Sequence, residues 1–310
     1  MNIKIDISII MINYKKADMT ISAIESVFEK TEGVCFEIIL IDNNSSDGSI
    51  EKIKNHFNDK IILIEAKENL GFGGANNIGI KIAKGKYIFL LNNDTLLINN
   101  AIKILFDFME TNDKVGVAGG NLYNLDGKPA FSFEKKFPKE KALFHLVFSG
   151  LCDILINILL KNYTLRKIHN FSQMPKKVGY IIGADMMIRK NILDETGCFD
   201  KDFFMFAEEA ELTSRIMKSG FASYNIPHAK ITHFEGGTAE MFSLMRQRMG
   251  IKSSLIFFYK MYGINQVKRF YRNHKFRLKY KYRKNKTLYE QYLKILESEY
   301  ENFLNNKNKM

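Results

Sequence analysis

The chain has 310 residues, 46% of them hydrophobic, so it can build one large domain or two medium ones around a substantial core. Its three cysteines, Cys35, Cys152 and Cys198, lie far apart, which excludes a disulfide scaffold and a paired-cysteine zinc module and suggests a reducing compartment. The net charge is +12, yet the last 70 residues hold 17 Lys/Arg against 4 Asp/Glu. A nearly neutral body with a basic tail favours a catalytic or binding domain that contacts an anionic surface.

The first 91 residues alternate between short apolar runs and amphipathic stretches. Strands are expected at residues 3–12, 36–41, 61–65 and 87–91, and helices at 17–29, 50–57 and 75–83, the last after a Gly-rich turn at 69–74. This order predicts an α/β fold with a doubly wound, mostly parallel sheet and helices on both faces. Ligands bind beyond the carboxyl ends of such strands, where Asp42 and Asn92-Asn93-Asp94 fall.

The pattern changes after a further expected strand at residues 115–119. Asp126-Gly127 predicts a hairpin turn between strands at 121–125 and 128–133. A strand at 177–189, a helix at 208–219 and a strand at 221–227 follow. Residues 144–160 are apolar with a polar residue at every fourth position, which predicts a helix that packs on the domain or a partner, or lies in a membrane interface. No stretch of 18 residues is free of charge, so an ordinary membrane span is not expected.

Two carboxylates follow strands in this sheet. Asp94 suits a hard divalent cation such as Mn²⁺ or Mg²⁺, and the alternative is an aspartate that caps a turn. Asp42 could accept a hydrogen bond from a nucleobase or ribose, but an Asx-turn in Asp-Asn-Asn-Ser is the favoured explanation of that residue alone.

Three further motifs could bind or react. The turn at Asn69-Leu-Gly71-Phe-Gly-Gly precedes a helix start, which favours an anionic ligand, but it matches neither a nicotinamide fingerprint nor a Walker loop. Glu208, Glu209 and Glu211 open a helix; the helix dipole accounts for two of them, and one could be a general base. His233 could be a metal ligand, although a lone histidine is more often structural.

In this order, the motifs resemble the inverting family 2 glycosyltransferases of the GT-A fold, and in particular rhamnosyltransferase-like members that build bacterial surface polysaccharides. The resemblance runs from residue 7 to about residue 238. It is carried by Ile12-Asn-Tyr14, Asp42-Asn-Asn-Ser-Ser-Asp-Gly-Ser49, Asn69-Leu-Gly-Phe72, Asn77-Ile-Gly79, Leu91-Asn-Asn-Asp-Thr95, Gly183-Ala184, Gly197-Cys-Phe-Asp200, Phe203-Phe-Met-Phe206, Glu208-Glu209, His233 and Gly236-Gly-Thr238.

The resemblance implies a role for each matching residue. Asp94 is the acid of a DXD-like motif that here reads Asn92-Asn93-Asp94, and His233 is the second ligand of a Mn²⁺ or Mg²⁺ ion. Glu209 stands where most relatives carry the catalytic aspartate of a Glu-Asp pair, with Glu208 as the fallback base. Asp42 contacts the nucleotide base. The residues expected to bind the nucleotide sugar are Asn13, Tyr14, Asp42, Asn69, Gly71, Phe72, Asn77, Asn92, Asn93, Gly183, Ala184 and Asp185.

The implied reaction transfers rhamnose or a hexose, with inversion, from a nucleotide-diphosphate donor to a hydroxyl of a growing, lipid-linked bacterial surface glycan, as in lipopolysaccharide or capsule synthesis. The expected domains are a GT-A domain at 1–240, with a nucleotide-binding half to about 120 and an acceptor half beyond, and an amphipathic, basic extension at 241–310. We expect a cytoplasmic protein, peripheral on the inner face of the membrane, and a homodimer is one candidate assembly. The tail after about Tyr262 is expected to bind anionic membrane without taking part in the chemistry.

Two other classes fit parts of the sequence. Residues 268–286 hold ten Lys/Arg among aromatic residues, which also suits a nucleic-acid-binding protein. Carboxylates in the crevice of a near-neutral body argue against that class, so no nucleic-acid partner is expected. A non-catalytic sugar-nucleotide-binding relative would have lost Asp94 or both glutamates, and this chain keeps them all.

Overall fold

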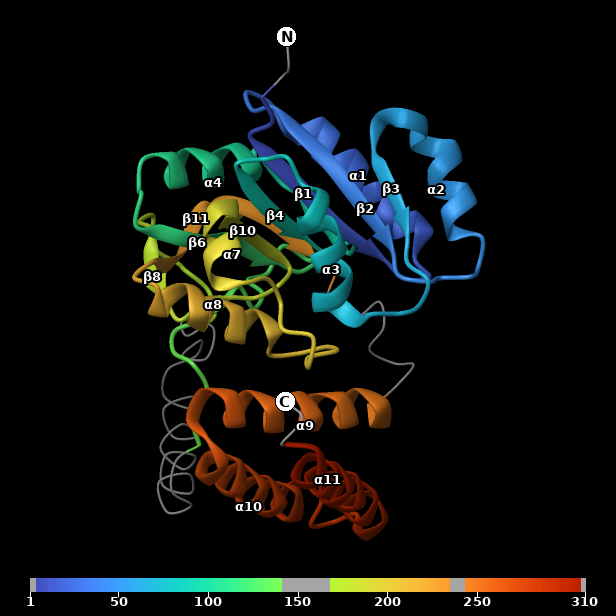
Figure 1. Cartoon of the computed structure of the whole chain (residues 1–310), viewed down its shortest axis with the longest axis vertical. Helices are drawn as coiled ribbons and strands as arrows, with labels where there is room; N and C mark the ends of the chain where they lie inside the picture. The colour runs from blue at the N-terminus through green and yellow to red at the C-terminus, as the bar shows by residue number, and fades with distance from the viewer. Residues whose placement is uncertain (1–3, 141–167, 235–242, 308–310) are drawn as a thin grey trace.

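The computed structural model describes residues 4–140, 168–234 and 243–307 (Figure 1). The strands are β1 (Ile7–Asn13), β2 (Phe36–Asp42), β3 (Ile62–Glu65), β4 (Tyr87–Leu91), β5 (Thr95–Leu97), β6 (Val115–Tyr123), β7 (Phe133–Glu134), β8 (Lys176–Val178), β9 (Tyr180–Ile181), β10 (Asp185–Arg189) and β11 (Ala222–His233). The helices are α1 (Ala17–Lys30), α2 (Ser49–Phe57), the 3₁₀ turn η1 (Asn58–Lys60), α3 (Gly71–Ile82), α4 (Ala101–Glu110), α7 (Lys190–Thr196), α8 (Glu208–Lys218), α9 (Ser243–Tyr262), α10 (Ile264–Lys281) and α11 (Lys286–Asn306).

The main sheet has the order β3-β2-β1-β4-β10-β6-β11-β5, with β8 paired to β11. The first four strands pair in parallel, and so do β6 and β11. β10 runs antiparallel between β4 and β6, and β5 runs antiparallel to β11. The predicted α/β fold, a sheet of mostly parallel strands with helices on both faces, is confirmed.

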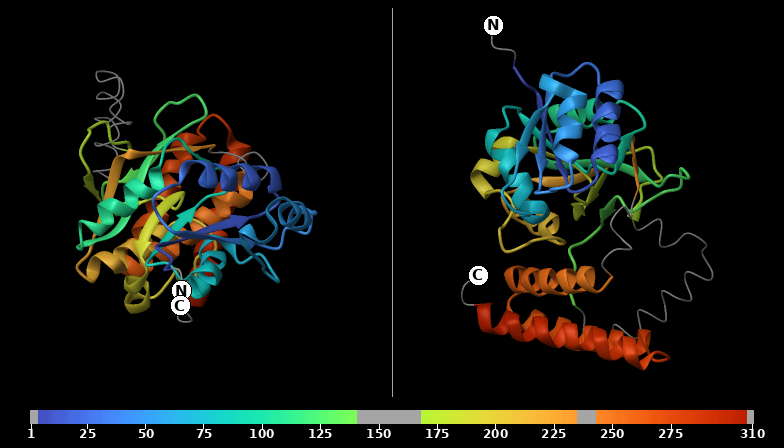
Figure 2. Two further views of the ribbon diagram at one scale, coloured as in Figure 1. Left: turned by 90° about the horizontal axis from the view of Figure 1, so that it is seen from above. Right: turned by 90° about the vertical axis from the view of Figure 1, so that its right-hand side faces the viewer.

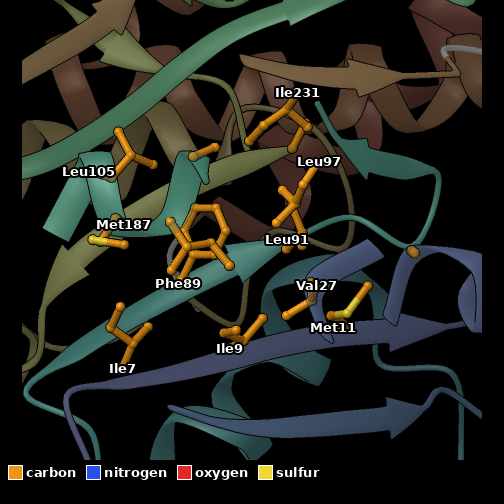
Figure 3. Close-up of a cluster of buried hydrophobic side chains, with 14 of the residues drawn as sticks. Ile7, Ile9, Met11, Val27, Phe89, Leu91, Leu97, Leu105, Met187 and Ile231 are labelled. Carbon is orange, nitrogen blue, oxygen red and sulfur yellow. The ribbon is translucent and has the colours of Figure 1, made fainter. Parts of the chain in front are cut away.

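Alternate residues of each central strand serve opposite faces of the sheet. On one face, Ile9 and Phe89 pack with apolar residues of α1, α2 and α4, and Figure 3 shows part of this cluster. On the other face, Ile10 and Leu90 pack with residues of α3, α7 and α8. Because both faces are covered, these strands are largely apolar on both sides, as is typical of a buried parallel sheet.

Several elements differ from the sequence-based expectation. α3 begins at Gly71 rather than near residue 75, because the Asn69 side chain accepts a hydrogen bond from the Gly71 amide and starts the helix earlier. The single strand expected at 177–189 is three strands, separated at Gly179 and Gly183. β6 continues through residue 120, where the two halves of the domain were expected to meet. Beyond the turn at Gly127, residues 128–132 form only one isolated bridge, at Pro129, instead of a regular strand.

The last three helices form a layer of their own beneath the α/β body, as Figure 2 shows from the side. Their core contains Phe257, Phe258, Leu296 and Phe303 from α9 and α11, and it also includes Phe203 of the body. Val267 and Phe270 of α10 belong to the same core, so cutting the chain after Tyr262 would remove part of the core on which α9 packs. Among the described helices, none is long and apolar enough to cross a membrane. Residues 144–160 and the expected domain boundary near residue 240 lie outside the described residues.

Candidate active site

The carboxylate of Asp42 is fully buried at the end of β2 and organises the loop that follows. It accepts hydrogen bonds from the Asn13 side chain at 2.6 Å, from the Ser45 hydroxyl at 2.6 Å and from the Ser45 amide at 2.9 Å. Asn13, which faces Asp42 across β1 and β2, accepts a hydrogen bond from Thr20 at 2.8 Å. These contacts match the loop-organising alternative for Asp42, while Tyr14 next to Asn13 is exposed.

A second set of amides joins this loop to the start of α3. The Asn43 side chain donates to Asn69 at 3.0 Å and accepts from the Leu70 amide at 2.9 Å. Asn69 in turn accepts from the Gly71 amide at 3.0 Å. The sequence motif at residues 69–71 therefore works here as a brace between two loops at the carboxyl edge of the sheet.

The first turns of α3 also touch the segment that precedes α8. The Phe72 amide donates to the carbonyl of Phe204 at 2.9 Å, and Gly71, at φ +71°, lies so close that a Cβ would stand 2.0 Å from that carbonyl oxygen. Asn77 exchanges two hydrogen bonds with the backbone of Phe199, at 2.8 and 3.0 Å. The ring of Phe72 covers Gly183, where a Cβ would stand 3.0 Å from it. These residues set the distance between α3 and the segment that precedes α8, and they do not present free polar groups to the crevice.

Asp94 and His233 lie together although 139 positions separate them in the sequence. β11 pairs with β5 so that His233 faces Thr95, which leaves His233 Nε2 3.3 Å from Asp94 Oδ1. The side chains are 11% and 20% exposed, so both can be reached from the crevice. His233 Nδ1 is buried with no partner among the described residues.

This pair fits one divalent cation. A carboxylate oxygen and an imidazole nitrogen suit Mn²⁺, and Mg²⁺ accepts the carboxylate, with donor phosphates and water completing the shell. No group of three or more His, Cys, Asp or Glu side chains gathers in the described parts of the chain, so the protein alone offers a two-ligand site there. Neighbouring residues fix the loop: Asn93 donates to Thr20 at 2.9 Å, and the Asn92 amide donates to Ala184 at 3.0 Å.

Two adjacent carboxyl groups open α8. Glu208 is buried, and its Oε2 has no hydrogen-bond partner in the described structure. Burial, with the neighbouring Glu209 charge, raises the pKa of Glu208 from 4.5 to about 8. Burial also raises the pKa of Glu209, a residue of intermediate exposure. Of the two carboxyl groups at the helix start, that of Glu209 belongs to the more exposed residue.

The backbone ahead of these glutamates is strained. Phe206 and Ala207 have φ of +75° and +66°, a left-handed conformation that residues with a Cβ rarely adopt. Each such residue costs about 1–3 kcal/mol unless its surroundings impose it, and such strain gathers at functional sites. The turn makes Glu208 and Glu209 the first residues of the helix.

A pocket of about 590 Å³ lies between the start of α1 and the start of α2. Phe234, the residue after His233, contributes to its wall, and the Phe234 amide donates to the Asp94 carbonyl at 2.9 Å. Asp94 and His233 themselves do not line this pocket. Lys15 and Lys16 also line the pocket, and no sequence motif singled them out.

The profile of the family described as Glycosyl transferase family 2 matches residues 8–197. The chain belongs to glycosyl transferase family 2. This confirms the resemblance and covers β1 to the end of α7, including the Asp42 loop, the start of α3 and Asp94.

Relatives of this family 2 chain include proteins whose names state their reactions. It is 23% identical over 209 residues to an N-acetylglucosaminyl-diphospho-decaprenol L-rhamnosyltransferase of Mycobacterium tuberculosis, covering 63% of this chain and 66% of that protein. It is 34% identical over 117 residues to the UDP-Glc:alpha-D-GlcNAc-diphosphoundecaprenol beta-1,3-glucosyltransferase WfaP of Escherichia coli, covering 38% and 46%. An uncharacterized glycosyltransferase of Rickettsia bellii is 38% identical over 107 residues, which are 34% of this chain and 15% of the relative.

One residue expected at the donor site of the family 2 domain is buried within the sheet. Asp185 is fully buried in β10, where one carboxyl oxygen accepts the Gly120 amide at 2.5 Å and the other has no partner in the described residues. Burial raises the pKa of Asp185 well above its ordinary value. Asp185 is as enclosed as Asp42, and its place at the donor site stays a prediction.

Glu211, the third glutamate at the start of α8, has a structural role, and its partner was not predicted from the sequence. Glu211 and Arg215, one helical turn apart on α8, form a bidentate pair at 2.8–3.0 Å. Arg215 also donates to the carbonyls of Thr196, Gly197 and Cys198. The pair caps the end of α7 and fixes the loop that leads to Phe199. The sequence signal that could have predicted this ion pair is a Glu followed four positions later by an Arg on the same helix.

Proposed function

We propose that this protein is an inverting, metal-dependent glycosyltransferase with Glu209 as its base. The observation that carries the proposal is the pair of carboxyl groups with raised pKa at the start of α8, in a family 2 domain that also joins Asp94 to His233. Glu209, the more exposed residue of the two, takes the base's role beside buried Glu208.

In the proposed reaction, Glu209 accepts the proton of an acceptor hydroxyl while that oxygen attacks the anomeric carbon of the donor sugar. The bond from that carbon to the diphosphate breaks on the opposite side, which inverts the configuration. Asp94 and His233 would hold a divalent cation that neutralises charge on the leaving diphosphate. The pocket beside Asp94, with Lys15 and Lys16 on its wall, is where we place the nucleotide.

For the acceptor we propose a lipid-linked glycan. The names of the mycobacterial and E. coli relatives describe transfer of rhamnose or glucose to sugars on polyprenyl diphosphates. Rhamnose or a hexose is therefore the proposed sugar.

The pH at which Glu209 becomes ionised sets the lower pH limit of activity, because a protonated carboxyl cannot accept the proton of the acceptor hydroxyl.

We further propose that α10 holds the enzyme on anionic membrane. Lys268, Arg272 and Lys279 recur at helical spacing and are exposed. Each basic residue near an anionic surface contributes about 1 kcal/mol. The triple variant Lys268→Gln/Arg272→Gln/Lys279→Gln should lose salt-sensitive sedimentation with phosphatidylglycerol vesicles, whereas truncation after Tyr262 would strip the shared core and test folding instead.

A panel of sugar nucleotides tests the activity itself. We expect one of them, in Mn²⁺, to raise the melting temperature and to be hydrolysed or transferred to a polyprenyl-diphosphate sugar. If no donor binds and the protein instead shows salt-sensitive binding to RNA, the nucleic-acid alternative gains and the proposal fails.

A further inference from the structure

The segment between Asp200 and Ala207 connects the body to the base, and α9 lies along it. Ser253 donates a hydrogen bond to the Met205 carbonyl at 2.6 Å. Lys260 stands 2.6 Å from the carboxylates of both Asp200 and Asp202.

At the other end of α9, Arg246 lies 5.5 Å from the centre of the Phe206 ring. Gly250, one turn further on, leaves room for the same ring, 3.9 Å from where its Cβ would be. Positions 246, 250, 253 and 260 fall on one face of a helix. As α9 proceeds from Arg246 to Lys260, its partners run back from Phe206 to Asp200, so helix and segment lie antiparallel.

The segment is held by α3 as well as by the core of the C-terminal helices. The Phe204 carbonyl accepts from the Phe72 amide of α3, and Phe203, 1% exposed, is part of the core of the C-terminal helices. Both anchors act within five residues of the left-handed pair Phe206 and Ala207. A strained turn persists only where its surroundings impose it, and here α3 and α9 supply those surroundings.

Together, α3 and α9 form a clamp on residues 200–207. Lys260 is the charged residue of this clamp. Its side chain is 20% exposed, and those of Asp200 and Asp202 are 23% and 20% exposed. Burial lowers the pKa of Lys260, but the hydrogen bonds to the two carboxylates outweigh it and raise the pKa. By contrast, the Lys275–Glu297 pair inside the helical layer is 44% and 40% exposed, where solvent weakens an ion pair.

We propose that Lys260 is a positioning residue for the catalytic base, so that the C-terminal helices take part in building the active site. The proposal rests on the proposed function in one respect, the identity of Glu209 as base; the clamp itself is independent of it. It reverses the expectation that the C-terminal extension only attaches the enzyme to a surface.

The test compares Lys260→Met with Lys260→Arg and with the matched control Lys275→Met, all in the full chain. Misplacing a reacting group by about 1 Å can cost about 10²-fold in rate. We expect kcat of Lys260→Met to fall about 10- to 100-fold while the KM for the donor changes less than about twofold. Lys260→Arg should recover most of the rate, and Lys275→Met should equal the wild type.

Hydrogen exchange gives a readout that needs no activity. In Lys260→Met, amides of residues 200–209 should exchange faster while those of β1, β2 and β4 stay unchanged. If exchange in 200–209 rises but no variant, wild type included, transfers sugar, the clamp stands and the proposed function fails. Wild-type exchange and kcat in Lys260→Met would overturn the inference, and so would faster exchange throughout the chain, because that indicates a general loss of stability.

Discussion

The two sides of the crevice treat their polar groups in opposite ways. On the donor side, which is the loop after β2 together with the start of α3, Asp42 accepts three hydrogen bonds. The side chains of Asn43 and Asn69 hydrogen-bond to each other, and the ends of the loop are attached to the sheet. On the base side, Glu208 has an unpartnered buried oxygen in the described structure, and two consecutive residues before it are left-handed. The donor side is organised by its own hydrogen bonds, whereas the base side depends on α3 and α9.

The contrast has a physical reason. A loop that only has to hold its shape gains from hydrogen bonds that are already made, because buried polar groups without partners are costly. A base must keep part of its bonding capacity for the substrate, so full satisfaction would lower its pKa and its reactivity. Changes on the base side should therefore affect turnover, and changes on the donor side should affect stability.

The largest expected effect is that of Glu209→Gln, which keeps the size of the side chain but removes its basicity. Turnover should fall by about 10²- to 10⁴-fold while donor affinity is largely kept. Steady-state transfer rates and donor titrations measure the two quantities. Glu208→Gln is the matched control; if it is the inactive variant and Glu209→Gln is active, the base is the buried glutamate.

Next in size is Asp94→Ala, which removes the carboxylate beside His233. Charge stabilisation by a bound cation is worth several kcal/mol, so turnover should fall at least about 10²-fold. Donor affinity in Mn²⁺ should drop much more than affinity in EDTA, which calorimetry can measure. A wild-type protein that binds donor equally with and without metal would refute the role given to this pair.

Asp42→Ala tests the donor side. It leaves the Asn13 amide and the Ser45 groups without their buried acceptor, which should cost about 1–3 kcal/mol of the free energy of unfolding. Thermal and urea unfolding measure this, with exposed Asp126→Ala as the control, which should leave stability unchanged. If Asp42→Ala keeps its stability but loses donor affinity, Asp42 contacts the nucleotide directly and the contrast between the two sides weakens.

The last prediction concerns the pH dependence of stability. The pKa of Glu208 is raised by burial to about 8 in the folded protein, against 4.5 unfolded, so the folded state holds a proton that the unfolded state releases. Its contribution to stability is therefore greatest below pH 4.5 and declines as the pH rises toward 8. Glu208→Gln cannot ionise, so its melting temperature relative to wild type should increase across that window. A constant difference between the two melting curves would show that Glu208 does not titrate there.

The sequence predicted the sheet from β1 to β4 because each of those strands is a short apolar run bounded by turn residues. No expected element covered α4, although Ile102, Leu105 and Met109 have helical spacing. The strand expected at 177–189 is interrupted at Gly179, where the backbone of Lys136 approaches closely, and at Gly183, which the Phe72 ring covers.

The site was harder to predict than the fold. Asp94 and Glu209 stood out by their place after a strand and at a helix start. The partnership of Asp94 with His233 needs the antiparallel pairing of β5 and β11, which no local pattern contains. Asp185 was expected at the site because it follows Gly183 and Ala184 of the motif, and its burial in β10 could not be predicted from that motif. The contact of Lys260 with Asp200 spans 60 positions and has no sequence signature.

The close approach of α3 to the segment that carries the base depends on the absence of a Cβ atom at Gly71. A single methyl group there would stand 2.0 Å from the Phe204 carbonyl oxygen, and backbone cannot retreat as a flexible side chain can. Alanine at this position would act as a wedge between α3 and the segment that carries the base. This would push the donor loop and Glu209 apart. A hydrogen atom is therefore the largest substituent that fits on the Cα of residue 71 at this junction of the enzyme.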